Sequence, residues 1–256
     1  MNTLFLASHL FCLGRGGEIL DQYKIVRNMK NNLKKQENFV FVASEPDNYE
    51  KTDVLSDLCI ESFDKTLPFK KYSVLDNRTK DHAKEMLEEA DLIFLSSGNV
   101  PTQNKFFEEI GLKDILEDLD CLIVGLSGGA MNMSEIVYSP PNREGESINP
   151  TYKRFLIGLG LTKVSILPNF LERSDRCIGG KNILNEIILP DSKNYPLFAL
   201  SDGAYIMQKE NKITVHGYSF LIDDGDYQLL LDDGEANITN LVNAFYDIKE
   251  FKPRIK

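Results

Sequence analysis

Ser127 is the residue whose neighbours most clearly indicate chemistry. It is the central serine of residues 125–129, which read Gly-Leu-Ser-Gly-Gly and match the G-x-S-x-G pattern of a nucleophile elbow. An apolar run at 122–126 precedes the serine as a predicted strand, and a helical stretch at 130–136 follows it. Backbone N–H groups at the start of a helix can stabilise an oxyanion. We therefore predict Ser127 to be a nucleophile; a plain tight turn, or a phosphate-binding one, is the alternative.

A second polar turn follows the preceding predicted strand. Residues 96–99 read Ser-Ser-Gly-Asn directly after the apolar run at 92–95. The carboxyl ends of parallel strands meet at one edge of a sheet, which is where such sheets bind ligands. Gly98 could thus place its N–H beside that of Gly128 as a two-donor oxyanion hole, while Asn99 caps a helix that starts near Pro101. A turn and helix cap without a further role is the alternative.

A serine nucleophile needs a base, which is normally a histidine oriented by a carboxylate. The chain has three histidines. We expect His82 to be solvated on a charged helix and His216 to be a structural residue at the end of a strand. His9 follows the first predicted strand and could lie at the same sheet edge as Ser127, although a structural role is the better expectation.

The first half of the chain has the pattern of a parallel sheet. Short apolar runs alternate with segments of helical period, as in βαβ units. We predict strands at 3–7, 39–43, 72–75, 92–95 and 122–126, with helices between them at about 19–33, 54–59, 80–90 and after 101.

The second half has a different organisation. Residues 139–147 are polar and rich in turn formers, which predicts a surface loop that could shape a site. Short runs at 197–201, 204–209, 213–216, 220–222 and 228–231 predict antiparallel strands that close the edge of the sheet. Because no linker separates these segments from the first half, we expect one α/β domain over residues 1–256.

Composition narrows the possible functions. The 29 Lys and Arg residues against 39 Asp and Glu give a net charge of −10, which disfavours binding to nucleic acids and to anionic membranes. Four scattered cysteines without a C-x-x-C pair argue against a zinc site and a disulfide framework. The N-terminus lacks the basic start of a signal peptide, and the apolar runs are too short for a membrane helix. We therefore expect a cytoplasmic protein without metal or organic cofactor.

Four segments together resemble a known family. Residues 97–99, 125–130, 166–170 and 200–204 occur in the order and spacing found in the dipeptidase E and cyanophycinase-type serine peptidases, and the similarity spans roughly residues 1–235. The resemblance implies a class I glutamine amidotransferase-like (flavodoxin-like) α/β fold: a mostly parallel central sheet flanked by helices, with a Ser nucleophile, a His base and a Glu or Asp partner. It also implies hydrolysis of N-terminal aspartyl dipeptides, as in dipeptidase E.

The same resemblance assigns roles to individual residues. Ser127 matches the nucleophile, Gly98 and Gly128 match the oxyanion-hole positions, and Asp202 matches the acidic member of the triad. The family's base stands in an apolar-Pro-His-aromatic segment, where this chain has Asn169. An asparagine cannot take a proton from a serine hydroxyl at neutral pH.

Two functional hypotheses follow. The first is a serine-type peptidase, weak or inactive because Asn169 replaces the base. The second is a non-catalytic homologue that binds a small carboxylate or peptide in the same pocket.

Three arginines are candidates for ligand contacts. Arg143, Arg173 and Arg176 could hold a ligand carboxylate or could be solvated surface charges. The sequence leaves the oligomeric state open.

Overall fold

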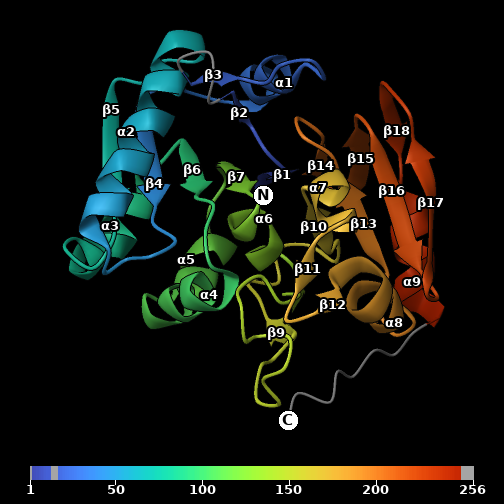
Figure 1. Cartoon of the computed structure of the whole chain (residues 1–256). Coiled ribbons are helices and arrows are strands. Elements are labelled where there is room, and N and C mark those ends of the chain that lie inside the picture. Colours follow the sequence, from blue (N-terminus) through green and yellow to red (C-terminus); the bar gives the residue numbers. More distant parts are fainter. Residues whose placement is uncertain (1, 13–16, 249–256) are drawn as a thin grey trace.

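The computed structural model describes residues 2–12 and 17–248, and of residues 12, 173 and 246–248 it describes the backbone only. Its main feature is a twisted central sheet with helices on both faces (Figure 1). A second, smaller sheet stands beside it, built from the later part of the chain. The chain is therefore an α/β protein, as predicted.

The central sheet is mostly parallel. In the described residues its strand order is β18-β15-β14-β1-β7-β6-β4-β5. The parallel strands are β1 (Thr3–Ala7), β4 (Asn38–Val42), β5 (Lys71–Leu75), β6 (Leu92–Leu95) and β7 (Leu122–Leu126). The predicted strand runs of the first half thus form the parallel part of the sheet, from β1 to the edge strand β5, and their carboxyl ends lie together at one end of the strands.

Three antiparallel strands extend this sheet beyond β1. They are β14 (Tyr205–Lys209), β15 (Lys212–His216) and β18 (Glu235–Asn237). This agrees with the prediction that short antiparallel strands close the sheet edge.

Helices cover both faces of the central sheet. Successive side chains of each parallel strand point to opposite faces of the sheet, and both faces are buried. On one face Phe39 and Phe94 pack against α1 (Ile25–Asn32) and α2 (Tyr49–Thr66). The other face is covered by α3 (Ala83–Glu88), which follows the short helix η1 (Lys80–His82), and by α4 (Val100–Glu109), α5 (Leu112–Glu117) and α9 (Thr239–Ile248). Near-continuous apolar strands are typical of a sheet buried in this way.

The second sheet corrects the predicted place of three segments. Runs 197–201, 220–222 and 228–231 were expected at the edge of the main sheet, but they form β13 (Leu197–Leu200), β16 (Ser219–Asp223) and β17 (Asp226–Leu231) of a separate sheet with β10 (Ile166–Pro168). A third apolar core holds this sheet against η2 (Leu184–Ile188) and α8 (Leu189–Ser192). Alternating patterns predict strands but do not specify which sheet they join.

Two predicted helices are shorter in the structure. The segment predicted as a helix over 19–33 is helical only over Ile25–Asn32, and Glu18–Ile19 is strand β3, paired with β2 (Phe11–Cys12). Likewise α6 spans Gly128–Asn132, after which β8 (Ile136–Tyr138) pairs with β9 (Phe155–Ile157). The remaining elements are α7 (Phe170–Ser174), β11 (Cys177–Ile178) and β12 (Lys181–Asn182).

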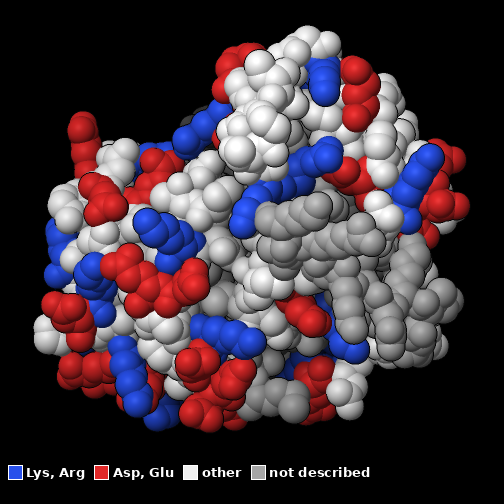
Figure 2. All heavy atoms as spheres, turned by 90° about the horizontal axis from the view of Figure 1, so that it is seen from below, with Lys and Arg blue, Asp and Glu red and all other residues white. Residues whose placement is uncertain are grey.

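Charged side chains of both signs are mixed over the face seen from below (Figure 2). This face shows no large field of one sign outside the atoms drawn in grey. In the part of the chain that the structure describes, no helix has the length and apolar character needed to cross the bilayer.

Candidate functional site

Ser127 lies at the junction of β7 and α6, in the geometry predicted for an elbow. Its backbone has φ 49° and ψ −109°, a positive-φ conformation that residues other than glycine rarely adopt. The Ser127 N–H donates to the carbonyl of Ala7 at 2.8 Å, and its own carbonyl accepts from the N–H of Met131 at 2.9 Å. These bonds fix the strained turn between the central strand and the helix, and leave the half-buried serine side chain on the wall of a pocket.

The turn after β6 lies directly against this elbow. A Cβ atom added to Gly128 would be 2.6 Å from the carbonyl oxygen of Gly98 and 3.3 Å from its nitrogen. A Cβ on Gly98 would in turn be 2.2 Å from Oγ of Ser44. The structure thus brings Gly98 and Gly128 together, as an oxyanion hole requires, and only glycine fits at both positions.

Asn99 caps α4, as its position before Pro101 predicts. Its Oδ1 accepts from the backbone N–H of Thr102 at 3.0 Å and from the Thr102 hydroxyl at 2.7 Å. The cap fixes the turn that carries Gly98 relative to the helix that follows.

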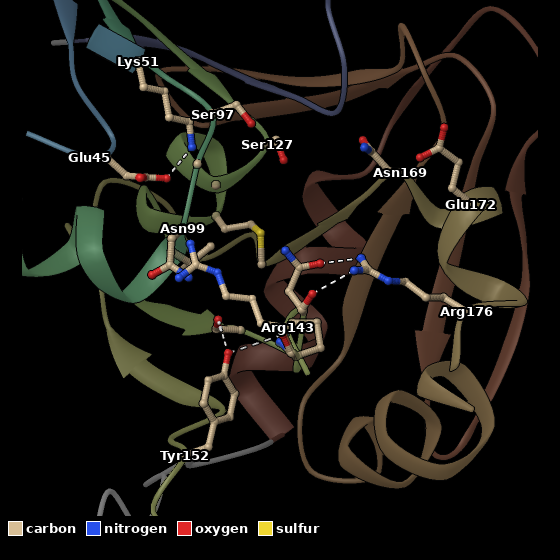
Figure 3. A pocket seen from close by; sticks show the side chains of 17 residues that line it. Glu45, Lys51, Ser97, Asn99, Ser127, Arg143, Tyr152, Asn169, Glu172 and Arg176 are labelled. Atoms are coloured by element: carbon tan, nitrogen blue, oxygen red, sulfur yellow. Dashed lines mark hydrogen bonds and ion pairs between the residues drawn. The ribbon is translucent and has the colours of Figure 1, made fainter. Parts of the chain in front are cut away.

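Ser127, Gly98 and Gly128 line a pocket of about 560 Å³ (Figure 3). The predicted loop 139–147 contributes Ser139, Pro140, Asn142 and Arg143 to the lining, so it shapes the pocket. The remaining lining residues are Glu45, Lys51, Ser97, Asn99, Val100, Met131, Tyr152, Asn169, Glu172 and Arg176.

Among the described side chains, three cationic ones line the pocket. Lys51 pairs with Glu45 on the wall next to Ser97. The Arg176 guanidinium donates to Oδ1 and to the carbonyl of Asn142, at 2.5 and 2.8 Å. Arg143 is exposed at the pocket, whereas the side chain of Arg173 lies outside the described residues. Two of the three predicted arginines therefore reach the pocket.

Asn169 faces the same pocket from the other side (Figure 3). It lies between β10 and α7 with φ 55°, a left-handed conformation that asparagine tolerates better than most residues. Its backbone N–H donates to Oγ of Ser8 at 2.8 Å, and Oγ of Ser8 donates to its Oδ1 at 3.2 Å. A carboxamide thus stands across the pocket from the candidate nucleophile.

Asp202 lies beside this pocket and not in its lining. It lines a neighbouring hollow of about 500 Å³, which shares Asn169 and Glu172 with the first. Its side chain is exposed, and its backbone carbonyl accepts from Nε2 of Gln22 at 3.1 Å. The four motif segments therefore converge on one region, with Ser127 and Asn169 in one hollow and Asp202 and Asn169 in the next.

The three histidines are outside the pocket lining. His9 is half-buried after β1, and its carbonyl accepts from the N–H of Gly203 at 2.9 Å. His82 is exposed near Glu85. His216 is buried, stacks on Tyr205 with ring centroids 4.4 Å apart, and has its Nε2 3.0 Å from the Thr214 hydroxyl; burial lowers its pKa.

Ser8 and Glu172 were not among the predicted site residues. Ser8 directly follows the central strand β1, so the rule that strand ends meet at one edge could have indicated it. Glu172 lies three residues after Asn169, in the first turn of α7, and lines both hollows. Its place depends on the helix that begins at Phe170, which the local sequence signals weakly.

Comparison with known proteins identifies the family and supports the fold. Residues 15–216 match the family described as Peptidase family S51. A crystal structure of a candidate peptidase E protein from Listeria monocytogenes EGD-e is similar in fold, with a TM-score of 0.55 and 15% sequence identity, and the match covers 90% of this chain and 100% of that one. The comparison with curated proteins gave no match. The matched residues include the elbow at Ser127 and the turn at Gly98. The chain therefore belongs to peptidase family S51.

Proposed function

We propose that the protein is a serine-type peptidase that hydrolyses a peptide or amide bond at Ser127. The observation that carries the proposal is the strained elbow at Ser127, with φ 49°, packed against the backbone of Gly98. In this arrangement Oγ of Ser127 attacks the carbonyl carbon and loses its proton to solvent water, while the N–H groups of Gly98 and Gly128 hold the oxygen as it becomes negative. The C–N bond then breaks as the leaving amine takes a proton from water, and a second water hydrolyses the acyl-enzyme to free Ser127.

The missing proton acceptor limits the rate of this reaction. Attack requires that the Ser127 hydroxyl proton leave, and the carboxamide of Asn169 cannot accept it at neutral pH. A positioned general base contributes about 10²- to 10⁴-fold to the rate of such steps. We therefore expect turnover that is slow but dependent on Ser127, supported by the oxyanion hole and by substrate binding.

The charges in the pocket suggest the class of substrate. Arg143 and Arg176 line it together with Lys51, whose charge is compensated by Glu45. Arginine holds carboxylates well because its planar guanidinium presents several donors. A small peptide that bears a carboxylate fits these groups, and the resemblance to dipeptidase E makes an N-terminal aspartyl dipeptide the first substrate to test.

A non-catalytic binding protein is the second candidate, and Asn169 is the observation that favours it. In that case the same pocket holds a small carboxylate or peptide without cleaving it. The glycine amides and the arginines then serve as ligand contacts only.

Hydrolysis of aspartyl-leucine separates the two functions. The purified protein and its Ser127→Ala variant are incubated with the dipeptide, and release of free leucine is followed by mass spectrometry. The peptidase function predicts slow release that disappears in Ser127→Ala. Release that is equal in both proteins contradicts it, and binding of the dipeptide without release supports the second candidate.

A further inference from the structure

Ser8 is a buried serine whose hydroxyl contacts Asn169 in the wall of the pocket. Its side chain is 0% exposed, and its backbone N–H donates to the carbonyl of Ala204 at 3.1 Å. Its Oγ accepts from the backbone N–H of Asn169 at 2.8 Å and reaches two acceptors, the carbonyl of Leu200 at 3.1 Å and Oδ1 of Asn169 at 3.2 Å. Ser8 therefore contacts both the backbone and the side chain of Asn169.

These contacts determine which end of the Asn169 carboxamide is available. Because Oδ1 faces the Ser8 hydroxyl, Nδ2 is the polar atom left for the pocket. The structure records no hydrogen bond from Nδ2 to any described residue, although Asn169 lines both hollows. An amide nitrogen carries two donors and no acceptor.

We infer that Ser8 fixes Asn169 as a hydrogen-bond donor, which holds a carbonyl or carboxylate oxygen of the bound peptide opposite Ser127. This inference rests on the proposed function, since it assumes that the pocket binds a peptide. Ser8 is a positioning residue and Asn169 the group that touches the ligand. The site then binds a peptide between two sets of donors, the Gly98 and Gly128 amides on one wall and Nδ2 of Asn169 on the other.

The orientation of Asn169 matters because the two ends of its carboxamide bind different ligand atoms. In the turned orientation Nδ2 would donate to Oγ of Ser8, whose single proton would then go to the carbonyl of Leu200, and Oδ1 would present an acceptor to the oxygens of a peptide. Two acceptors that face each other without a proton between them form no bond, and a desolvated pair of this kind is unfavourable.

Side-chain NMR of the ¹⁵N-labelled protein tests the donor role directly. The Nδ2 resonance of Asn169 is identified by its loss in Asn169→Asp, and aspartyl-leucine is titrated into the Ser127→Ala protein so that no cleavage occurs. We expect the Asn169 side-chain signal to shift together with the backbone amides of Gly98 and Gly128. If the glycine amides shift and Asn169 does not, the inference is wrong and the proposed function stands. If none shifts, both are wrong.

Asn169→Asp also tests the same point by affinity, because it replaces the donor nitrogen by an acceptor oxygen of equal size and adds a negative charge, and both changes oppose a ligand oxygen at this position. In the Ser127→Ala background we expect affinity for aspartyl-leucine to fall at least tenfold. Unchanged or tighter binding overturns the donor role.

Ser8→Ala tests the positioning role, and Ser192→Ala is its matched control. Ser192 is also fully buried, with a hydroxyl that accepts from the N–H of Gly225 at 3.0 Å and donates to the carbonyl of Leu189 at 2.8 Å. We expect Ser8→Ala to lower the affinity at least threefold and to broaden the Asn169 side-chain signal, whereas Ser192→Ala changes neither. A Ser8→Ala protein with both properties intact overturns the positioning role. If Ser8→Ala fails to fold, Asn169→Asp still decides the donor role.

Discussion

At the scale of single residues, the proposed site combines a candidate nucleophile, Ser127, with an asparagine, Asn169, where the family resemblance implies a histidine base. Ser127, Gly98 and Gly128 could be predicted from sequence because glycine-flanked turns after apolar strands leave a local signal. The structure brings them to one pocket with Asn169. Ser8 could not be assigned a role in this way, since its contact with Asn169 joins residues 161 positions apart.

Asn169→His is expected to strengthen the nucleophile. A histidine there supplies the missing base, so we expect fluorophosphonate labelling of Ser127 to accelerate at least tenfold. The rate should rise with pH through about 6.5, the ordinary pKa of histidine, because only the neutral ring accepts a proton. The measurement is the labelling rate between pH 5 and 8.

Asn169→Gln is the control for this change, because it keeps a carboxamide and adds no base. An equal acceleration in Asn169→Gln, or none in Asn169→His, would show that the base is not what limits Ser127. In the second case the position of Asp202, outside the Ser127 pocket, is the next feature to examine.

At the scale of elements, the site is the contact between the turn after β6 and the elbow before α6. Gly128→Ala tests this contact, since the added Cβ would lie 2.6 Å from the carbonyl oxygen of Gly98. Backbone atoms cannot move away as a side chain does, so we expect a loss of about 1–3 kcal/mol in the free energy of unfolding. The labelling rate of Ser127 should fall as well. Both are measured on the same protein, by urea denaturation and by probe labelling.

Gly234→Ala is the comparison for this variant. Gly234 has φ 79° and no heavy atom within 4 Å of an added Cβ, so alanine there costs stability through backbone conformation alone. A Gly234→Ala protein should lose stability and keep its labelling rate. If Gly128→Ala keeps its labelling rate, the reactivity of Ser127 does not depend on the contact between Gly128 and Gly98, and the prediction is wrong.

Asn99→Ala tests the helix cap next to Gly98. Loss of the Asn99 side-chain bonds to Thr102 should lower the free energy of unfolding by about 1 kcal/mol, as removal of an N-cap typically does. Asn99→Asp keeps a capping oxygen and should retain most of that stability. Equal loss in both variants in urea denaturation would show that the cap is not the cause.

The elements also show where prediction from sequence ends. The parallel strands were predictable because their near-continuous apolar runs are typical of strands buried on both faces. The strand at Leu197–Leu200 was also recognised, but its partner is β10 in the second sheet. That pairing depends on the apolar core around Phe170, Leu197 and Phe220, which forms only in the folded chain and leaves no local pattern.

At the scale of the whole molecule, the buried histidine His216 belongs to the fold and not to the pocket. Burial lowers the pKa of His216, and nearby Glu235 opposes that shift only in part. The native state therefore binds a proton less readily than the unfolded chain. The resulting stability is present above the unfolded pKa of about 6.5 and is lost as the pH falls below it.

His216→Phe is expected to reduce this dependence on pH. Phenylalanine keeps a ring against Tyr205 and cannot titrate. Between pH 7.5 and 5.0 the wild type should lose more stability than the variant, with a difference of at most about 1.4 kcal/mol per pH unit for one proton. Urea denaturation at both pH values measures it, with the exposed His82→Gln as control. Equal slopes in wild type and His216→Phe would contradict the assignment.

The central claim is that Ser127 is a nucleophile held at an oxyanion hole. Treatment of the wild type and Ser127→Ala with a fluorophosphonate probe, followed by peptide mass spectrometry, tests it most directly. We predict slow labelling confined to Ser127 that is absent from Ser127→Ala. An unlabelled wild type, or a label found on other residues and equally in Ser127→Ala, would contradict the claim and leave the pocket as a site that binds without cleaving.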